Sequence, residues 1–260
     1  MILDKIVEKK KEEIKIAKQK MPISILKKDV WMRATLGAFK RAIHVEGQIK
    51  LIAEVKKSSP SKGVIVSSFN PLDIACKYQS AGASAISVLT DERFFDGKLE
   101  YMKNIKDRVT IPVLRKDFII DEYQIYESLV NHADAILLIA RILTFQQLKD
   151  YQDIAKELGL DCLVEVHDEE DIEKALKSGS SVIGINNRDL SSFNVDIITT
   201  EKLIKYLPAD KVIVSESGIA NYRDVMFLQG LGVDAILVGE SLLSSKDIIL
   251  KVREILGHGV

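Results

Sequence analysis

Short runs of apolar residues recur along most of the chain, and segments of mixed character separate them. The runs are rich in Ile, Val and Leu, so each predicts a strand that is buried on both faces. From Ile49 onward the runs are IKLIAEV, SAISVLT, IPVLRKDF, DAILLIA, DCLVEVH, SVIGINN, KVIVSES and DAILVGE. The pattern therefore predicts eight buried strands.

The segments between these strands carry apolar residues at helical spacing. Pro71 begins one such segment, and Thr144 is a suitable N-cap for another. Strict alternation of strands and helices implies parallel strands with right-handed crossovers. Eight such units in about 210 residues favour an α/β fold of the closed (β/α)8 or TIM-barrel type. The alternative is an open doubly wound sheet, but no GxGxxG motif follows the first strand.

The first 45 residues do not fit this alternation. They predict an N-terminal helical extension over residues 1–45 that caps the barrel or packs beside it. Residues 46–260 then supply the eight βα units of the same single domain, 1–260. The apolar residues that can share one side of the first helix are Ile2, Ile6, Val7, Ile14 and Ala17. The basic run KKKEEIKIAKQK is interpreted as the solvated face of this helix.

Composition narrows the classes of function. The chain has 260 residues, 47% of them hydrophobic, and a formal net charge of −1. Balanced charge argues against nucleic acid or an anionic membrane as the partner, because either requires clustered Lys and Arg. The longest apolar runs are far too short to cross a bilayer, and the N-terminus lacks the apolar stretch of a signal peptide. We therefore expect a cytoplasmic protein, monomeric or only weakly self-associating.

Metal and disulfide chemistry have no signal in the chain. Cys76 and Cys162 are far apart and form no CxxC pair, so reduced thiols are expected. The histidines show no metal-ligand spacing, and His167 is interpreted as a loop residue that at most lines a pocket. No metal and no cofactor are expected.

Charged residues interrupt the apolar runs near the ends of the predicted strands. In a closed barrel these ends meet at one mouth, and burial of a charge is costly unless the group is paired or functional. The same-facing pair of Glu54 and Lys56 ends the first strand. The polar residues at the strand ends are Glu54, Lys56, Thr90, Asp91, Lys116, Glu165, Asn186, Arg188, Glu216, Ser217, Glu240 and Ser241.

A phosphate site is predicted at the last two strands. Gly218 and Gly239 each follow a strand shortly before a helix, and barrels of this type often bind phosphate there through backbone N–H groups. Glu240 and Ser241 lie beside the second glycine. Ser59 is either a turn residue beside Pro60 or a hydroxyl donor to an anion.

The motifs IAEVKKSSPSKG, SVLTDERFFDG, LRKDFIIDEYQIYE, ADAILLIARIL, LVEVH, GINNRDL, VSESGI and ILVGESL occur in the chain in this order. In order and spacing the chain resembles the indole-3-glycerol phosphate synthases of tryptophan biosynthesis. The resemblance implies ring closure, decarboxylation and dehydration of 1-(2-carboxyphenylamino)-1-deoxyribulose 5-phosphate, giving indole-3-glycerol phosphate, CO2 and water. A phosphorylated small molecule is then the partner of the site, and neither metal nor cofactor is required.

The resemblance also implies roles for the charged residues. Lys116 corresponds to the general acid that protonates the substrate carbonyl, a task that suits an ammonium whose pKa is lowered by desolvation and neighbouring cations. Glu165 corresponds to the base or acid of the dehydration step. Lys56 corresponds to the lysine that meets the substrate anion and can pass a proton. Glu54 would orient the lysines and balance their charge.

The remaining site residues follow from the same resemblance. Asn186 and Arg188 match positions that hold hydroxyls or the carboxylate, and Glu216 and Ser217 match positions near the ribulose chain. Ser59 matches a binding residue whose contact is left open.

The resemblance implies that Gly218, Gly239 and Glu240 form the phosphate-binding site. Many relatives carry Ser or Thr at the third position, so only the backbone contribution of Glu240 is carried over. One departure is His132, where relatives usually have Gly. There His132 or Asn131 must adopt a positive φ, or the turn must differ.

Two other functions remain open at this stage. One is another phosphate-binding barrel, such as phosphoribosylanthranilate isomerase or the tryptophan synthase α-subunit. The other is a phosphate sensor that keeps the barrel but has lost the chemistry.

Overall fold

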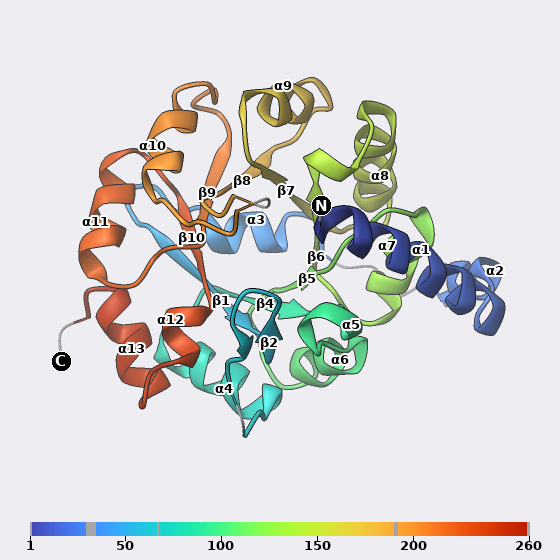
Figure 1. Ribbon diagram of the computed structural model, residues 1–260, viewed down its shortest axis with the longest axis horizontal. Helices are drawn as coiled ribbons and strands as arrows, with labels where there is room; N and C mark the ends of the chain where they lie inside the picture. The colour runs from blue at the N-terminus through green and yellow to red at the C-terminus, as the bar shows by residue number, and fades with distance from the viewer. Residues whose placement is uncertain (1, 30–34, 67, 190–191, 259–260) are drawn as a thin grey trace.

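Eight parallel strands close into a barrel in the computed structural model, which describes residues 2–29, 35–66, 68–189 and 192–258 (Figure 1). The strands are β1 (Lys50–Val55), β4 (Ala85–Leu89), β5 (Val113–Lys116), β6 (Ala135–Ile139), β7 (Asp161–Val166), β8 (Val182–Asn186), β9 (Val212–Glu216) and β10 (Ala235–Val238). Strand β1 pairs with both β4 and β10, which closes the sheet. The predicted (β/α)8 barrel is confirmed, and the open sheet is wrong.

Helices surround the barrel (Figure 1). They are α4 (Pro71–Ala81), α5 (Glu92–Phe95), α6 (Leu99–Lys106), α7 (Glu122–Val130), η2 (Ala140–Ile142), α8 (Phe145–Glu157), α9 (Glu169–Lys177), α10 (Ile198–Ile204), α11 (Tyr222–Gly230), α12 (Glu240–Leu243) and α13 (Ile248–Ile255). The two predicted helix starts are confirmed: Asn70 caps α4 ahead of Pro71, and Thr144 forms a capping box with Gln147. A short hairpin of β2 (Ser58–Ser59) and β3 (Gly63–Val64) follows β1.

Successive residues along each strand pack alternately into two different hydrophobic cores. On β1, Leu51 and Ala53 pack in the layer between strands and helices, whereas Ile52 packs among the side chains inside the barrel. Since side chains alternate with a period of two, Glu54 and Lys56 continue the inward-facing row of Ile52. The same alternation places an inward-facing polar residue at the end of several other strands.

The N-terminal extension packs against the barrel. It contains α1 (Ile2–Lys20), α2 (Ile23–Leu26), η1 (Lys27–Asp29) and α3 (Ala38–Ile43). Phe39 and Ile43 of α3 are fully buried among the inward-facing barrel residues. The backbone N–H groups of Gly37 and Lys40 donate to the Asp161 carboxylate at the start of β7, at 3.1 and 3.0 Å. Helix α3 therefore packs at the amino-terminal ends of the strands.

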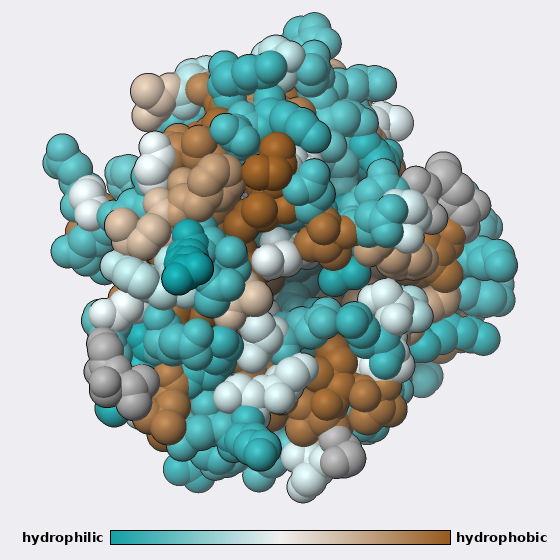
Figure 2. Space-filling view, turned by 60° about the vertical axis from the view of Figure 1, so that its left-hand side comes forward, coloured by the Kyte–Doolittle hydropathy of each residue, from teal (hydrophilic) through white to brown (hydrophobic). Residues whose placement is uncertain are grey.

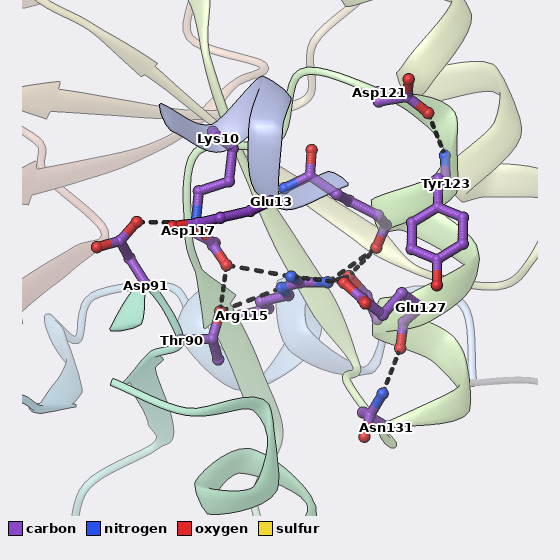
Figure 3. A network of polar contacts seen from close by, with 12 residues as sticks. Lys10, Glu13, Thr90, Asp91, Arg115, Asp117, Asp121, Tyr123, Glu127 and Asn131 are labelled. Carbon is purple, nitrogen blue, oxygen red and sulfur yellow. Dashed lines mark hydrogen bonds and ion pairs between the residues drawn. The ribbon is translucent and has the colours of Figure 1, made fainter. Parts of the chain in front are cut away.

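The predicted solvated face of α1 is wrong at Lys10. This side chain is 6% exposed, and its ammonium lies 2.8 Å from Asp91 and 3.0 Å from Asp117 (Figure 3). Thr90 donates to Asp117 at 2.6 Å, and Arg115 contacts the same oxygen at 3.1 Å. These buried carboxylates at the ends of β4 and β5 provide the charge that makes burial of an ammonium tolerable.

The turn before β6 is one of the two forms expected. His132 has a φ of 66°, and its backbone N–H donates to the carbonyl of Leu129 at 2.9 Å.

On the face shown in Figure 2, hydrophilic residues cover most of the surface and hydrophobic residues form separate patches. In the parts of the chain that the structure describes, no helix has the length and apolar character needed to cross a membrane.

Candidate active site

A cavity of about 620 Å³ opens at the carboxyl ends of the strands. The structure brings all twelve candidate residues to this one cavity: Glu54, Lys56, Ser59, Lys116, Glu165, Asn186, Arg188, Glu216, Ser217, Gly218, Gly239 and Glu240. Thr90 and Asp91, also placed at strand ends, instead belong to the buried network around Lys10. The roles of the twelve residues stay predictions at this point.

Lys116 forms the centre of the inward-facing charges. Its Nζ lies 3.1 Å from Oε2 of Glu165 on β7 and 3.5 Å from Oε2 of Glu216 on β9. Directly after β1, Lys56 donates to the carboxylate of Glu54 on that strand. Two lysines and three carboxylates therefore share one buried region, where charge interactions are stronger than in water.

The neighbours of Lys116 differ from those expected. Burial alone lowers the pKa of Lys116, but the carboxylates of Glu165, Glu216 and Glu54 outweigh burial and hold that pKa above its ordinary value. The expectation that neighbouring cations lower this pKa is therefore wrong for the structure. Lys116 is instead held as an ammonium.

Glu165 and Glu216 flank the same lysine but differ in their preference for a proton. Burial raises the pKa of Glu165, yet Lys116 and then His167 outweigh it and hold the pKa well below its usual range. Burial raises the pKa of Glu216 to about 8; Lys116 opposes the rise, while Glu165 and Glu54 add to it. Paired groups with pKa values pushed apart are typical of acid–base sites.

Two glycines make room for these carboxylates. A Cβ at Gly184 of β8 would collide with the Glu216 carboxylate, and a Cβ at Gly239 would collide with that of Glu54. Gly184 was missed in the sequence analysis, although a glycine inside a strand signals close approach of another group.

The predicted phosphate end combines left-handed backbone with cationic side chains. Ser217 and Gly218 have φ values of 69° and 83°, and Asn187 donates to the carbonyl of Ser217 at 3.0 Å. Two cations approach Glu240 at the start of α12: Lys62 at 3.4 Å and Arg188 at 3.7 Å. Lys62 was missed because the loop after β1 contains several lysines that the pattern does not distinguish.

An apolar wall lines another part of the cavity. Its members include Ile2, Leu3, Ile6, Leu89, Phe95, Phe118, Leu137 and Ile139. The rings of Phe95 and Phe118 have centroids 6.1 Å apart. This wall was not predicted from the sequence, because an apolar residue at a strand end is not distinguishable from ordinary core by pattern alone.

His167 is a further residue that the sequence analysis undervalued. It is not an open loop residue: its side chain is 4% exposed, and Nε2 lies 3.2 Å from Oε1 of Glu165.

Among the described residues, no group of three or more His, Cys, Asp or Glu is arranged to hold a metal ion.

A closed barrel with buried lysines and carboxylates at its carboxyl-terminal mouth defines an enzyme of the (β/α)8 class. Among solved structures, 3-hexulose-6-phosphate synthase from Salmonella typhimurium has a similar fold, with a TM-score of 0.66 and 16% identity over 80% of this chain and 97% of that chain. At that identity the similarity establishes the fold alone. It agrees with the closed barrel described above.

The sequence profile described as "Indole-3-glycerol phosphate synthase" matches residues 3–255. The protein of that name from Caldanaerobacter subterraneus subsp. tengcongensis is 51% identical over 259 residues, covering 97% of this chain and 99% of its own. Its counterpart from Campylobacter jejuni subsp. jejuni serotype O:6 is 49% identical, covering 95% and 96%. The chain therefore belongs to the indole-3-glycerol phosphate synthase family, a family of carboxy-lyases that act on a phosphorylated small molecule. The other phosphate-binding barrels considered above are excluded.

Proposed function

We propose that the cavity at the barrel mouth carries out the family's reaction through Lys116 and Glu165. The observation that carries this proposal is the 3.1 Å contact between the Lys116 ammonium and the Glu165 carboxylate inside that cavity. The substrate is 1-(2-carboxyphenylamino)-1-deoxyribulose 5-phosphate. Its products are indole-3-glycerol phosphate, CO2 and water.

Lys116 is the general acid. As the ring carbon that bears the carboxylate attacks the ketone, the ammonium donates a proton to the developing alkoxide. Decarboxylation then restores the aromatic ring. Because neighbouring carboxylates keep Lys116 protonated, it enters the reaction with the proton that this step requires.

Glu165 is the base of the dehydration step. The former carbonyl oxygen receives a second proton and leaves as water, while the carbon beside the nitrogen loses its proton to the carboxylate. The short contact between Glu165 and Lys116 allows this proton to return to the lysine. Two protons are delivered and one is recovered, so each turnover takes one proton from solvent.

The remaining residues bind the substrate and compensate charge. Lys56 and Arg188 meet the benzoate-type carboxylate, and Glu54 orients Lys56. Asn186, Ser217 and Glu216 hold the hydroxyls of the ribulose chain, with Ser217 already donating to Asn186 at 3.0 Å. These contacts supply the fixed geometry that an intramolecular ring closure requires.

The two ends of the substrate are bound by different surfaces. The backbone of Gly218 and Gly239, beside Glu240, binds the phosphate, and Ser59 faces the same cavity. The apolar wall that includes Phe95 and Phe118 takes the aromatic ring.

The direct test is turnover of the carboxyphenylamino substrate by purified protein, followed by indole fluorescence. Activity should appear without added nucleotide and should persist in EDTA. Binding of the phosphate ester without turnover would support a sensor instead. Loss of activity in EDTA, restored by a divalent metal, would contradict the metal-free mechanism.

We also propose a single domain, a cytoplasmic location and a monomer with at most weak self-association. Support for one domain comes from α3, which packs into the barrel, and from α1, whose Leu3 and Ile6 line the cavity. Support for a reducing compartment comes from Cys76 and Cys162, which are both free. Cell fractionation and sedimentation velocity test location and mass.

A further inference from the structure

A buried histidine outside the cavity has no part in the mechanism above. His167 follows β7, two residues after Glu165, and it is not among the described residues that line the cavity. Its side chain is 4% exposed. An ionisable ring in this position is costly to bury unless its neighbours compensate it.

The two oxygens of Glu165 face different cationic groups. Oε2 lies 3.1 Å from Nζ of Lys116, and Oε1 lies 3.2 Å from Nε2 of His167. The carboxylate therefore lies between a lysine of β5 and a histidine at the end of its own strand.

Asp171 lies on the far side of the imidazole. Its Oδ2 lies 3.5 Å from Nδ1 of His167 and accepts the backbone N–H of the same histidine at 3.1 Å. Asp171 is itself buried in the first turn of α9, where its backbone N–H donates to the N-cap Asp168 at 2.9 Å. The three side chains of Asp171, His167 and Glu165 thus form a row that begins at a helix terminus.

Charged groups from several elements affect the pKa values of these three side chains. Glu54 of β1, Lys116 of β5 and Glu216 of β9 surround Glu165, and Arg141 of η2 lies 3.5 Å from Asp171. Burial lowers the pKa of His167, and Arg141 lowers it further. Asp171 and Glu165 outweigh both and raise it to about 9, so the ring is an imidazolium at neutral pH.

Glu216 provides an internal comparison. It is as buried as Glu165 and lies near the same lysine, but Oε1 of Glu216 takes part in none of the described ion pairs, whereas Oε1 of Glu165 lies 3.2 Å from Nε2 of His167. Its pKa is raised to about 8, whereas that of Glu165 is lowered. In addition to a closer contact with Lys116 and a hydrogen bond with Asn186, Glu165 has a second cation, His167, at 3.2 Å.

We propose that His167, anchored by Asp171, is a positioning residue whose imidazolium fixes Glu165 beside Lys116 and keeps that carboxylate ionised as the base of the reaction. This inference rests on the proposed function, in which Glu165 accepts the proton lost by carbon. His167 acts through Glu165 and does not touch the substrate.

The first test is the pH profile of His167→Gln, with the exposed His44→Gln as matched control. Removal of a contacting cation raises the pKa of a carboxyl by about one unit or more. Because the pKa of Glu165 lies well below its usual range in wild type, the profiles are compared down to the most acid pH at which both proteins stay folded, and there the acid limb of kcat/KM should move to higher pH. The activity ratio of variant to wild type then falls as pH falls, with little change in KM. His44→Gln should follow the wild-type profile.

His167→Lys, which restores a cation, should return the acid limb towards its wild-type position. Asp171→Asn should move it in the same direction as His167→Gln. A His167→Gln profile that stays parallel to wild type at every pH would overturn the proposal, because a merely structural role lowers activity by a constant factor.

The second test does not depend on activity. The ring protons of His167 are followed by NMR titration, assigned by their absence in His167→Gln. The pKa should lie near 9 in wild type and fall in Glu165→Gln. A wild-type value at or below the ordinary 6.5, or no change in Glu165→Gln, overturns the proposal. Wild type without turnover contradicts the proposed function alone, and the titration still decides whether His167 holds Glu165.

Discussion

The ammonium of Lys116 lies 3.1 Å from the carboxylate of Glu165, although the two residues are 49 positions apart in the chain. Each ends or nearly ends an inward-facing row, Lys116 on β5 and Glu165 on β7. Their contact depends on closure of the barrel, because β6 lies between the two strands in the sheet.

Replacement of Lys116 by Met should remove the acid. We expect kcat to fall by roughly two to four orders of magnitude, the usual contribution of a positioned proton donor. Steady-state kinetics with indole fluorescence measure the loss. Lys149→Met, on the exposed face of α8, is the control and should retain wild-type kcat. Near-normal turnover by Lys116→Met would remove the role assigned to this lysine.

Glu216→Gln should change how stability depends on pH. The pKa of Glu216 is raised to about 8 from an ordinary 4.5, so in this interval the folded state holds a proton that the unfolded state has lost. The contribution of this group to stability is present below pH 4.5 and is lost as pH rises towards 8.

Because Glu216→Gln cannot bind this proton, its stability should not fall over this pH interval. Relative to wild type, its free energy of unfolding should rise by up to about 1.4 kcal/mol for each pH unit in the interval. Urea unfolding at a series of pH values measures the difference. Glu170→Gln, exposed on α9, is the control. A constant difference between pH 5 and 8 would show that Glu216 is ionised throughout.

Gly218→Ala should weaken phosphate binding. Gly218 has a φ of +83°, and an added Cβ would lie 2.7 Å from Cγ1 of Val195. An alanine in the left-handed region costs about 1–2 kcal/mol, so the loop should shift and KM should rise on the order of tenfold. Calorimetric titration with inorganic phosphate provides a second measurement. Gly230→Ala, with no atom within 4 Å of the new Cβ, should bind phosphate like wild type.

Lys10→Met should destabilise the protein and loosen α1. Removal of this cation leaves Asp91 and Asp117 with less compensation, and breaking a buried ion pair costs about 3–5 kcal/mol. Because Leu3 and Ile6 of the same helix line the cavity, KM should rise as well. Lys9→Met is the control, since Lys9 is 39% exposed and contacts only Glu12 among the described ion pairs.

The destabilisation by Lys10→Met should shrink in acid. Burial raises the pKa of Asp117, but Lys10 and then Arg115 outweigh it and hold the pKa below its ordinary 3.8. The stability gained from this carboxylate is present above 3.8 and is lost as pH falls through the depressed value. The free energy of unfolding of wild type and of Lys10→Met is measured at pH 7 and at pH 3. Equal destabilisation at both values would contradict the charge-based explanation.

The periodicity of the chain determined the eight strands, the alternating helices and the closed barrel, because fully buried parallel strands require continuous apolar runs. The polar interruptions of these runs also identified the inward-facing charges. Barrel symmetry brings the carboxyl ends of all strands to one mouth, so residues such as Glu54 and Glu216 were predicted together without knowledge of their contacts.

Only the tertiary structure decided which charges pair. Lys10 lies in a basic run and is buried only because α1 docks over Asp91 and Asp117. Likewise, three carboxylates around Lys116 raise its pKa, whereas the role implied by the resemblance suits a lowered value. His167 contacts Glu165 through the shape of the turn into α9. Periodicity specifies which face a residue occupies, but a pKa depends on distances across elements that pair only after folding.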